Sequence, residues 1–215
     1  MSELVTAQEG VLRELRLQIA SGKLSPGQQV IQDALAASLG VSRVPLREAL
    51  KVLEGEGQVI YHPHRGYFVA DLSVADLVEV YRIRSILEDE ALRVGVPLLT
   101  YEDIEYLEDI LVDVEEAAKT GNITAVTAAN RRFHFAIFEA SNMPRLVRMI
   151  RNQWDATDAY RSVYFATPAN LAHMNTEHRS MIAALVARDV EKSIAQQAAH
   201  RENSVTVVSQ AINKS

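Results

Sequence analysis

The sequence contains no cysteine, and among its 215 residues there are only 9 glycines, 6 prolines and 6% aromatic residues. The absence of cysteine excludes disulfides, cysteine-ligated zinc, iron–sulfur clusters and thiol catalysis. The small numbers of glycine and proline favour a mostly helical fold. No apolar run approaches the roughly 18 residues of a membrane span, and residues 1–10 are too polar for a signal peptide. We therefore expect a soluble cytoplasmic protein with no membrane partner.

The net charge of −6 is unevenly distributed along the chain. Residues 1–70 contain 7 basic and 7 acidic residues, whereas residues 71–215 contain 15 basic and 21 acidic ones. At roughly 150 residues per domain, the length allows one large domain or two small ones. The change in pattern near residue 71 predicts two domains, at 4–71 and 74–211, in a mainly α protein.

The first domain is predicted to contain three helices followed by a β-hairpin. Apolar residues recur with helical spacing over 6–19, and the two following helices are separated by Gly40, with Ser42 as the cap of the third. Two β-prone runs then flank residues 62–66, where Pro63 and Gly66 are typical of a hairpin tip. This order predicts a winged helix-turn-helix.

The third helix of this domain has the features of a DNA recognition helix. Arg43 and Arg47 share one face near its start, and Leu46, Leu50 and Leu53 share the other. Arginine can bond guanine at two positions at once. Two arginines at this spacing alone are more typical of an ordinary three-helix bundle. Their combination with a capped helix, a turn glycine and a wing favours DNA binding.

The segments "LGVSRVPLREAL" and "RGYFV" resemble the winged helix-turn-helix of the GntR family of bacterial transcription regulators, and the resemblance covers residues 6–70. It implies that this domain binds double-stranded DNA. The predicted DNA-contacting residues are Ser42, Arg43, Arg47, His64, Arg65 and Gly66. The sequence departs from some members of the family at Asp33, where they have a phosphate-binding arginine, and at Val44 and Pro45.

The second domain is predicted to be an all-α bundle of six to seven helices. We expect helices at 73–95, 101–119, 122–140, 143–165, 168–187 and 189–212. Asn130 and His134 are four residues apart and share a helical face, while His178 and His200 fall on the last two helices. Three histidines from three helices can converge inside a bundle and bind a metal. The alternative from spacing alone is three unrelated, hydrogen-bonded histidines.

The segment "NRRFHFAIFEAS" and the last two helices resemble the FCD ligand-binding domain of the FadR subfamily, over roughly residues 74–209. Many members bind a divalent metal through one aspartate and three histidines. The resemblance implies that His134, His178 and His200 are metal ligands and that Asn130 occupies the aspartate position. An amide lacks the carboxylate charge, so we expect weaker binding and a preference for Zn²⁺ or Ni²⁺ over Mg²⁺ or Ca²⁺. The alternative is a metal-free pocket in which the histidines bind an anionic effector directly.

A histidine-lined or metal-centred cavity with arginines nearby favours a small carboxylate effector. Arg84 and Arg161 are the predicted effector-binding residues, because guanidinium groups bind carboxylates in bidentate pairs. Arg82 is a further candidate. Arg84 is four residues before Glu88, so a structural ion pair between them is the alternative.

The predicted function is therefore that of a homodimeric transcription regulator, most simply a repressor, that binds a two-fold symmetric operator and responds to a small organic acid. A dimerisation scaffold on a DNA-binding domain is the alternative. Three histidines also hold catalytic zinc in hydrolases, but the sequence has no H-E-x-x-H, G-x-S-x-G or P-loop motif, so we do not expect an enzyme.

Overall fold

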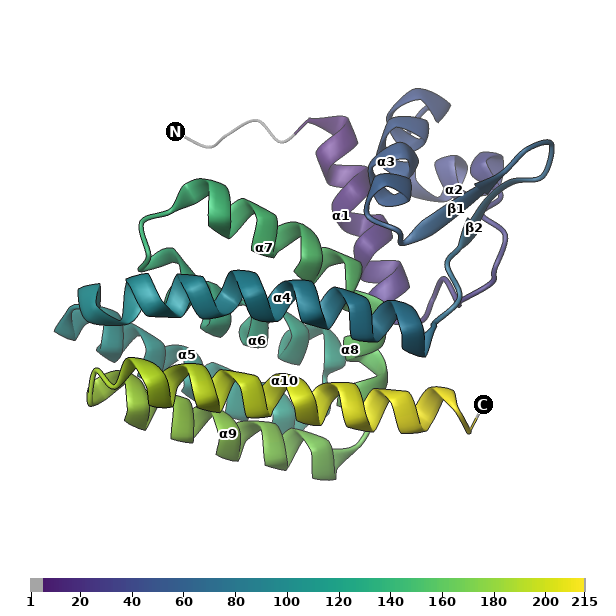
Figure 1. Ribbon diagram of the computed structural model, residues 1–215. Helices are drawn as coiled ribbons and strands as arrows, with labels where there is room; N and C mark the ends of the chain where they lie inside the picture. The colour runs from purple at the N-terminus through teal and green to yellow at the C-terminus, as the bar shows by residue number, and fades with distance from the viewer. Residues whose placement is uncertain (1–5, 215) are drawn as a thin grey trace. The chain divides into compact units, whose positions relative to one another are not determined.

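The computed structural model describes residues 6–214, and these form two compact units divided between Leu72 and Ser73. Each unit has its own core. The first is a small three-helix domain with a two-stranded sheet, and the second is all-helical, apart from its connecting segments (Figure 1). The prediction of a mainly α protein with a winged helix-turn-helix followed by a helical bundle is confirmed.

The first unit is built from the elements α1 (Ala7–Ala20), α2 (Gln32–Leu39), α3 (Arg43–Gly55), β1 (Val59–His62) and β2 (Gly66–Val69). Thr6 and Glu9 form a reciprocal capping box that fixes the start of α1. α3 packs on both α1 and α2. Leu15 of α1 and Leu46, Leu50 and Leu53 of α3 are almost completely buried, so one face of α3 is held against the domain.

The turn between α2 and α3 depends on Gly40, which has a φ of 66°. This left-handed conformation ends α2, and the Gly40 N–H donates to the carbonyl groups of Ala36 and Ala37. Ser42 is the residue before α3 and has extended backbone, as predicted for a cap, but its side chain makes no capping hydrogen bond.

The two strands form an antiparallel hairpin in which Tyr61 pairs with Tyr67 and His62 with Gly66. Gly66 has a φ of 86°, a value that suits glycine at the end of the tip. The hairpin is tied to the segment before α2, because the Val30 N–H donates to the Tyr67 carbonyl at 2.8 Å. The wing is therefore anchored at a defined place beside the helix-turn-helix.

The second unit consists of α4 (Val74–Gly95), a 3₁₀ turn η1 (Val96–Leu98), α5 (Tyr101–Thr120), α6 (Ile123–Glu139), α7 (Pro144–Ala156), α8 (Asp158–Phe165), α9 (Pro168–Val186) and α10 (Val190–Ile212). α4 and α10 run side by side, and α6 lies behind them, where it packs on α4, α5, α7 and α8 (Figure 1). α9 packs on α5, α8 and α10.

The prediction of one continuous helix over 143–165 is wrong, because the chain breaks at Thr157 into α7 and α8. Thr157 has φ −102° and ψ 8°, and its N–H donates to the Trp154 carbonyl. The Arg161 guanidinium also donates to that carbonyl at 2.7 Å. These groups satisfy the Trp154 carbonyl at the buried end of α7, so the helix can stop there and α8 can begin.

The core beneath α4 and α7 is aromatic, with Phe135, Phe138 and Trp154 packed against Ala91 and Ile150. At the end of α4, Gly95 approaches the loop after α6 so closely that a Cβ there would lie 2.9 Å from the Ser141 nitrogen. In residues 6–214, no helix is both long enough and apolar enough to cross a bilayer.

Candidate functional site

The recognition helix α3 has a buried leucine face and an exposed polar face. Ser42, Arg43 and Arg47 are exposed at its first two turns. Val44 is also 70% exposed there, and an exposed valine on such a surface has the chemistry to contact a thymine methyl group. Val44 is not among the DNA-contacting residues predicted from the sequence. The available signal was an apolar residue lying off the leucine face.

The wing tip is exposed as well. His64 and Arg65 are on the surface, and His64 has a φ of 63°, a conformation that is uncommon for a residue with a side chain. The Arg65 guanidinium lies 5.1 Å from the centre of the Phe68 ring, and the Arg65 carbonyl accepts a hydrogen bond from Gln29 at 2.6 Å.

Arg43 and Arg65 line one shallow hollow of about 290 Å³, together with Gly66 and the start of α2. The structure thus brings predicted DNA-contacting residues from the helix and the wing to one place. Asp33 lines the same hollow and forms an ion pair with Arg43. The departure from the family noted at Asp33 therefore places a negative charge beside a predicted DNA contact.

In the helical unit, the predicted metal ligands His134, His178 and His200 converge from α6, α9 and α10. One ligand atom of each lies within 4.8 Å of the others, and all three residues are buried. His134 Nε2 and His178 Nε2 are 3.2 Å apart. Two nitrogens bound to one zinc at about 2.0–2.1 Å would be separated by about 2.9–3.4 Å, so this spacing fits a coordination shell.

Two histidines of the cluster, His134 and His178, are held in the neutral form by their surroundings. Burial lowers the pKa of His134 well below its usual range, and the neighbouring His200 and His178 lower it further. Burial also lowers the pKa of His178 well below its usual range, with a further contribution from His200. Neutral imidazoles keep a nitrogen lone pair free, which is the form that binds metals.

Asn130 lies one turn before His134 and is 2% exposed. Its Oδ1 atom is buried without a hydrogen-bond partner, as are the Nδ1 atoms of His134 and His178. Buried polar atoms of this kind are normally paired with protein, water or an ion. The unpaired amide oxygen and the Nε2 atoms of His134 and His178 are a donor set that suits a borderline divalent metal.

His200 differs from the other two histidines because its Nδ1 atom has a partner. The Glu177 carboxylate lies 2.7 Å from it, and the same carboxylate lies 3.1 Å from Nε2 of His173. Glu177 is not among the site residues predicted from the sequence. Glu177 is one residue before His178, and adjacent residues lie on different sides of a helix. The spacing therefore gives no signal that Glu177 contacts the cluster.

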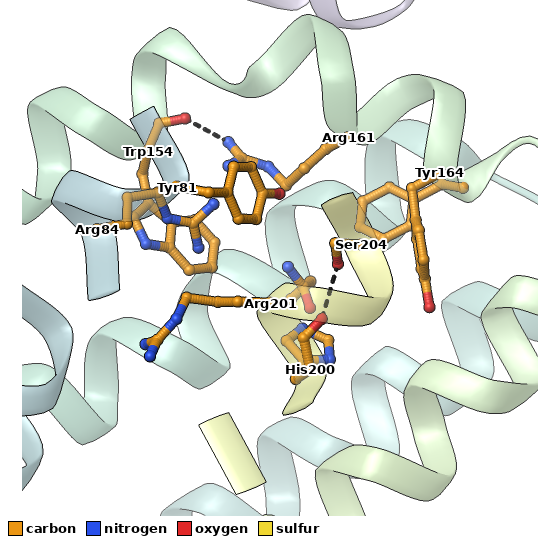
Figure 2. A pocket seen from close by; sticks show the side chains of 10 residues that line it. Tyr81, Arg84, Trp154, Arg161, Tyr164, His200, Arg201 and Ser204 are labelled. Carbon is orange, nitrogen blue, oxygen red and sulfur yellow. Dashed lines mark hydrogen bonds between the residues drawn. The ribbon is translucent and has the colours of Figure 1, made fainter. Parts of the chain in front are cut away.

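The predicted effector residues Arg84 and Arg161 line a cavity of about 20 Å³ that Asn130 and His200 also line (Figure 2). A space of this size holds about one water molecule. An organic acid could enter only if the surrounding side chains moved. Arg82 is exposed and does not line this cavity.

Both arginines already have partners. Arg84 donates from Nε to Glu88 at 2.8 Å and is stacked on Tyr81 and Trp154, each at 4.4 Å from the ring centre. Arg161 pairs with Asp158 and donates to Thr157 Oγ1 at 2.7 Å. The ion pair of Arg84 with Glu88, which the spacing offered as an alternative to effector binding, is thus present.

Glu88 is the centre of a buried polar network. Besides Arg84, its carboxylate accepts hydrogen bonds from Trp154 at 2.7 Å, Gln197 at 2.8 Å and Arg201 at 2.9 Å. Burial alone raises the pKa of Glu88, but the Arg84 and Arg201 guanidinium groups outweigh burial and lower the pKa to about 2. The carboxylate therefore stays charged and ties α4, α7 and α10 together.

Tyr81 and Arg201 line a second, outer groove as well as the inner cavity. This groove lies between α4 and α10 and has a volume of about 530 Å³. The two side chains form the common wall of the groove and the cavity. Arg201 was not selected from the sequence, because its partners Glu88 and Asp89 lie more than 100 positions earlier in the chain.

A winged helix-turn-helix with exposed arginines, joined to a separate helical domain with a buried polar centre, defines a class of two-domain DNA-binding regulators. Two family models match the sequence. One is that of bacterial regulatory proteins of the gntR family, over residues 7–69, and the other is that of the FCD domain, over residues 79–203. The chain belongs to the GntR family and carries an FCD domain, which confirms both resemblances.

The curated relatives are transcription regulators and not enzymes. The HTH-type transcriptional regulator McbR of Escherichia coli (strain K12) is 33% identical over 183 residues, which are 84% of this chain and 83% of McbR. The probable D-xylose utilization operon transcriptional repressor of Paenarthrobacter nicotinovorans is 30% identical over 178 residues, covering 81% of this chain and 76% of the relative.

Solved structures agree with this assignment. The structure of E. coli McbR/YncC matches with a TM-score of 0.87 and 30% identity, covering 97% of this chain and 99% of that chain. A putative transcriptional regulator GntR from Rhodococcus sp. RHA1 matches with a TM-score of 0.81 over 95% of this chain and 98% of that chain. Its identity of 24% shows a shared fold only.

Proposed function

We propose that this regulator is a homodimeric repressor whose binding to a two-fold symmetric operator is modulated by a small carboxylate effector at a bound divalent metal. The observation that carries the proposal is the convergence of His134, His178 and His200 within 4.8 Å inside the sensing domain. Buried imidazole nitrogens are normally paired with a partner, and a bound metal would give the ring nitrogens of this cluster a common one.

The three histidines would hold the metal, and Asn130 would contribute its unpaired amide oxygen. When bound, Zn²⁺ or Ni²⁺ supplies a Lewis-acid centre with an open position for a carboxylate oxygen. The chain's own residues orient the imidazoles and exclude bulk water. The alternative, in which the histidines bind an anion without metal, is less well supported. The lowered pKa values of His134 and His178 leave them uncharged, so they attract an anion only weakly.

The effector's carboxylate is proposed to contact Arg84 and Arg161. Each arginine has a planar guanidinium with more N–H donors than the present hydrogen bonds use. Because the cavity of about 20 Å³ is too small for an organic acid, binding requires the side chains of its wall to move. Such a rearrangement gives an effector different affinities for two states, which is the requirement for regulation.

On DNA, Arg43 and Arg47 are proposed to contact base edges from the major groove, with Ser42 contacting phosphate near the start of α3. His64, Arg65 and Gly66 of the wing are proposed to contact the adjacent backbone or minor groove. A single recognition helix reads few base pairs, so two copies on a symmetric operator are needed for useful affinity. Repression agrees with the relative from Paenarthrobacter nicotinovorans, which is a probable transcriptional repressor.

The test of the metal site is the metal content and nickel affinity of the full-length protein. Wild-type protein stripped with EDTA should bind about one nickel or zinc ion per chain by calorimetry. The His134→Ala/His178→Ala variant should bind none, and a His62→Ala variant, which removes an exposed histidine of the wing, should bind normally. Equal nickel binding by wild type and the double variant would overturn the assignment.

The Asn130→Asp variant tests whether the amide faces the metal. A carboxylate at this position adds a full negative charge to the donor set, and we expect nickel affinity to rise by about tenfold or more. Unchanged affinity would mean that residue 130 does not contribute to the site.

A further inference from the structure

Glu177 lies on α9, next in sequence to His178, yet its carboxylate contacts the third histidine of the cluster. Glu177 Oε2 is 2.7 Å from His200 Nδ1, and the Glu177 side chain is only 14% exposed. The second carboxylate oxygen, Oε1, lies 3.1 Å from Nε2 of His173, which is 58% exposed. The carboxylate is thereby held between a surface histidine and a buried one.

This contact fixes the protonation pattern of His200. An ionised carboxylate can only accept hydrogen bonds, so Nδ1 of His200 must carry the hydrogen that it donates to Glu177. The lone pair is then on Nε2, the ring nitrogen that Glu177 does not use. His134 and His178 have no such partner, since their Nδ1 atoms are buried without hydrogen bonds. His200 is therefore the one member of the cluster whose tautomer is set by a neighbouring acid.

The same contact supplies a charge that the cluster itself lacks. The donors of the cluster itself are three imidazoles and the Asn130 amide, and none of them is a carboxylate. A divalent cation placed among them would bring two positive charges into a buried site, which is costly without a compensating anion. A carboxylate one hydrogen bond away raises the basicity of the imidazole that it orients.

We propose that Glu177 is a positioning residue, which holds His200 with Nε2 free for the metal and provides the negative charge that Asn130 does not. The proposal rests on the metal site proposed above. In this proposal, the negative charge that an aspartate at position 130 would supply comes from Glu177, which acts on the metal only through His200.

The experiment compares nickel affinity in EDTA-stripped full-length proteins by competition with a chelating dye. Glu177→Gln keeps an acceptor oxygen but loses the charge, and we expect about 10- to 100-fold weaker nickel binding. Glu191→Gln is the matched control, because it removes an exposed acid from α10, the helix that carries His200. It should bind nickel as the wild type does. Circular dichroism and thermal melting confirm that each variant is folded.

A second measurement reads the tautomer directly, without metal. The ¹⁵N imidazole shifts of the metal-free wild type should show His200 with hydrogen on Nδ1, and Glu177→Ala should release this preference. Two results would overturn the role of Glu177. One is that wild type and Glu177→Gln bind nickel with the same affinity. The other is that His200 of the metal-free wild type carries its hydrogen on Nε2. A wild type that binds no nickel would instead overturn the metal site itself, so the two failures are distinguishable.

Discussion

The arginines predicted to bind ligands differ in exposure between the two domains. In the DNA-binding domain, Arg43, Arg47 and Arg65 are exposed, and the ion pair of Arg43 with Asp33 leaves their side chains 73% and 64% exposed. In the sensing domain, Arg84 and Glu88 are 3% and 0% exposed. The first arrangement leaves charges available to a partner, and the second uses them to hold helices together.

Because of this difference, substitutions of the exposed arginines should affect binding to a partner, whereas substitutions of the buried charges should affect the stability of the fold. Exposed ion pairs contribute about 0–1 kcal/mol, so the surface arginines can be changed with little effect on folding. Removing one member of a buried charged network costs about 3–5 kcal/mol, because the remaining charges lose their partner. The sensing domain therefore cannot rearrange its polar centre without a large change in free energy, and a ligand that supplies new partners can shift that balance.

The largest expected effect is on stability in the sensing domain. Glu88→Ala leaves Arg84 and Arg201 buried without their common carboxylate and should lower the free energy of unfolding by about 3–5 kcal/mol. Urea denaturation measures the change. Glu90→Ala is the control, since Glu90 is an exposed acid on the same helix, paired with Arg93, and should cost less than about 0.5 kcal/mol. Similar costs for the two variants would contradict the contrast between buried and exposed charge.

The next effect is a pH dependence of the free energy of unfolding, which arises from the Glu88 carboxylate. The pKa of Glu88 is lowered from 4.5 to about 2 in the folded protein, so the charged form stabilises the fold above about pH 4.5. That contribution, about 3 kcal/mol, is lost as the pH falls from 4.5 through 2. The stability difference between wild type and Glu88→Gln should be constant from pH 7 to 5.5 and should shrink below pH 4.5. A stability difference that grows as the pH falls would contradict the predicted direction of the pH dependence.

In the DNA-binding domain, the expected effects are on affinity alone. Arg43→Ala and Arg47→Ala should each weaken binding to a selected operator by about 1–3 kcal/mol, or roughly 5- to 150-fold, and leave the unfolding free energy nearly unchanged. Fluorescence anisotropy measures the affinity. Arg13→Ala, which removes an exposed arginine from α1, is the control. Operator binding that survives both recognition-helix substitutions would remove α3 from the interface.

The smallest expected effect concerns Asp33. Because its carboxylate lies in the hollow lined by Arg43 and Arg65, it opposes DNA phosphate, and Asp33→Asn should raise affinity for random duplex DNA by about two- to fivefold at low salt. Glu116→Gln, which removes an exposed acid paired with Lys119 in the other domain, should leave this affinity unchanged. An affinity that falls in Asp33→Asn would mean that Asp33 orients Arg43 productively.

Much of the architecture is predictable from local patterns. Helical periodicity, the turn at Gly40 and the β-prone runs around residues 62–66 correspond to elements of the first domain, because each depends on residues close in sequence. The break at Thr157 was not predicted, since it depends on a carbonyl that a side chain of the next helix satisfies. Periodicity carries no information about such a contact.

The candidate site shows the same division. The positions of His134, His178 and His200 were selected from spacing and resemblance, and the structure brings them together. Glu177 and Arg201 were not selected, because their roles come from hydrogen bonds between helices that are adjacent only after folding. The ion pair of Arg84 with Glu88 can be predicted from their spacing, whereas the hydrogen bonds that Glu88 accepts from three other side chains cannot.

The proposed function requires that a metal bound at the buried histidine cluster influences the affinity of the DNA-binding domain for its operator. The most direct test measures operator affinity of EDTA-treated full-length protein with and without added nickel, in wild type and in His134→Ala/His178→Ala. We expect nickel to change the wild-type dissociation constant by at least about fivefold and to leave that of the double variant unchanged. A wild-type dissociation constant that nickel does not alter, in a protein that binds nickel, would contradict the claim.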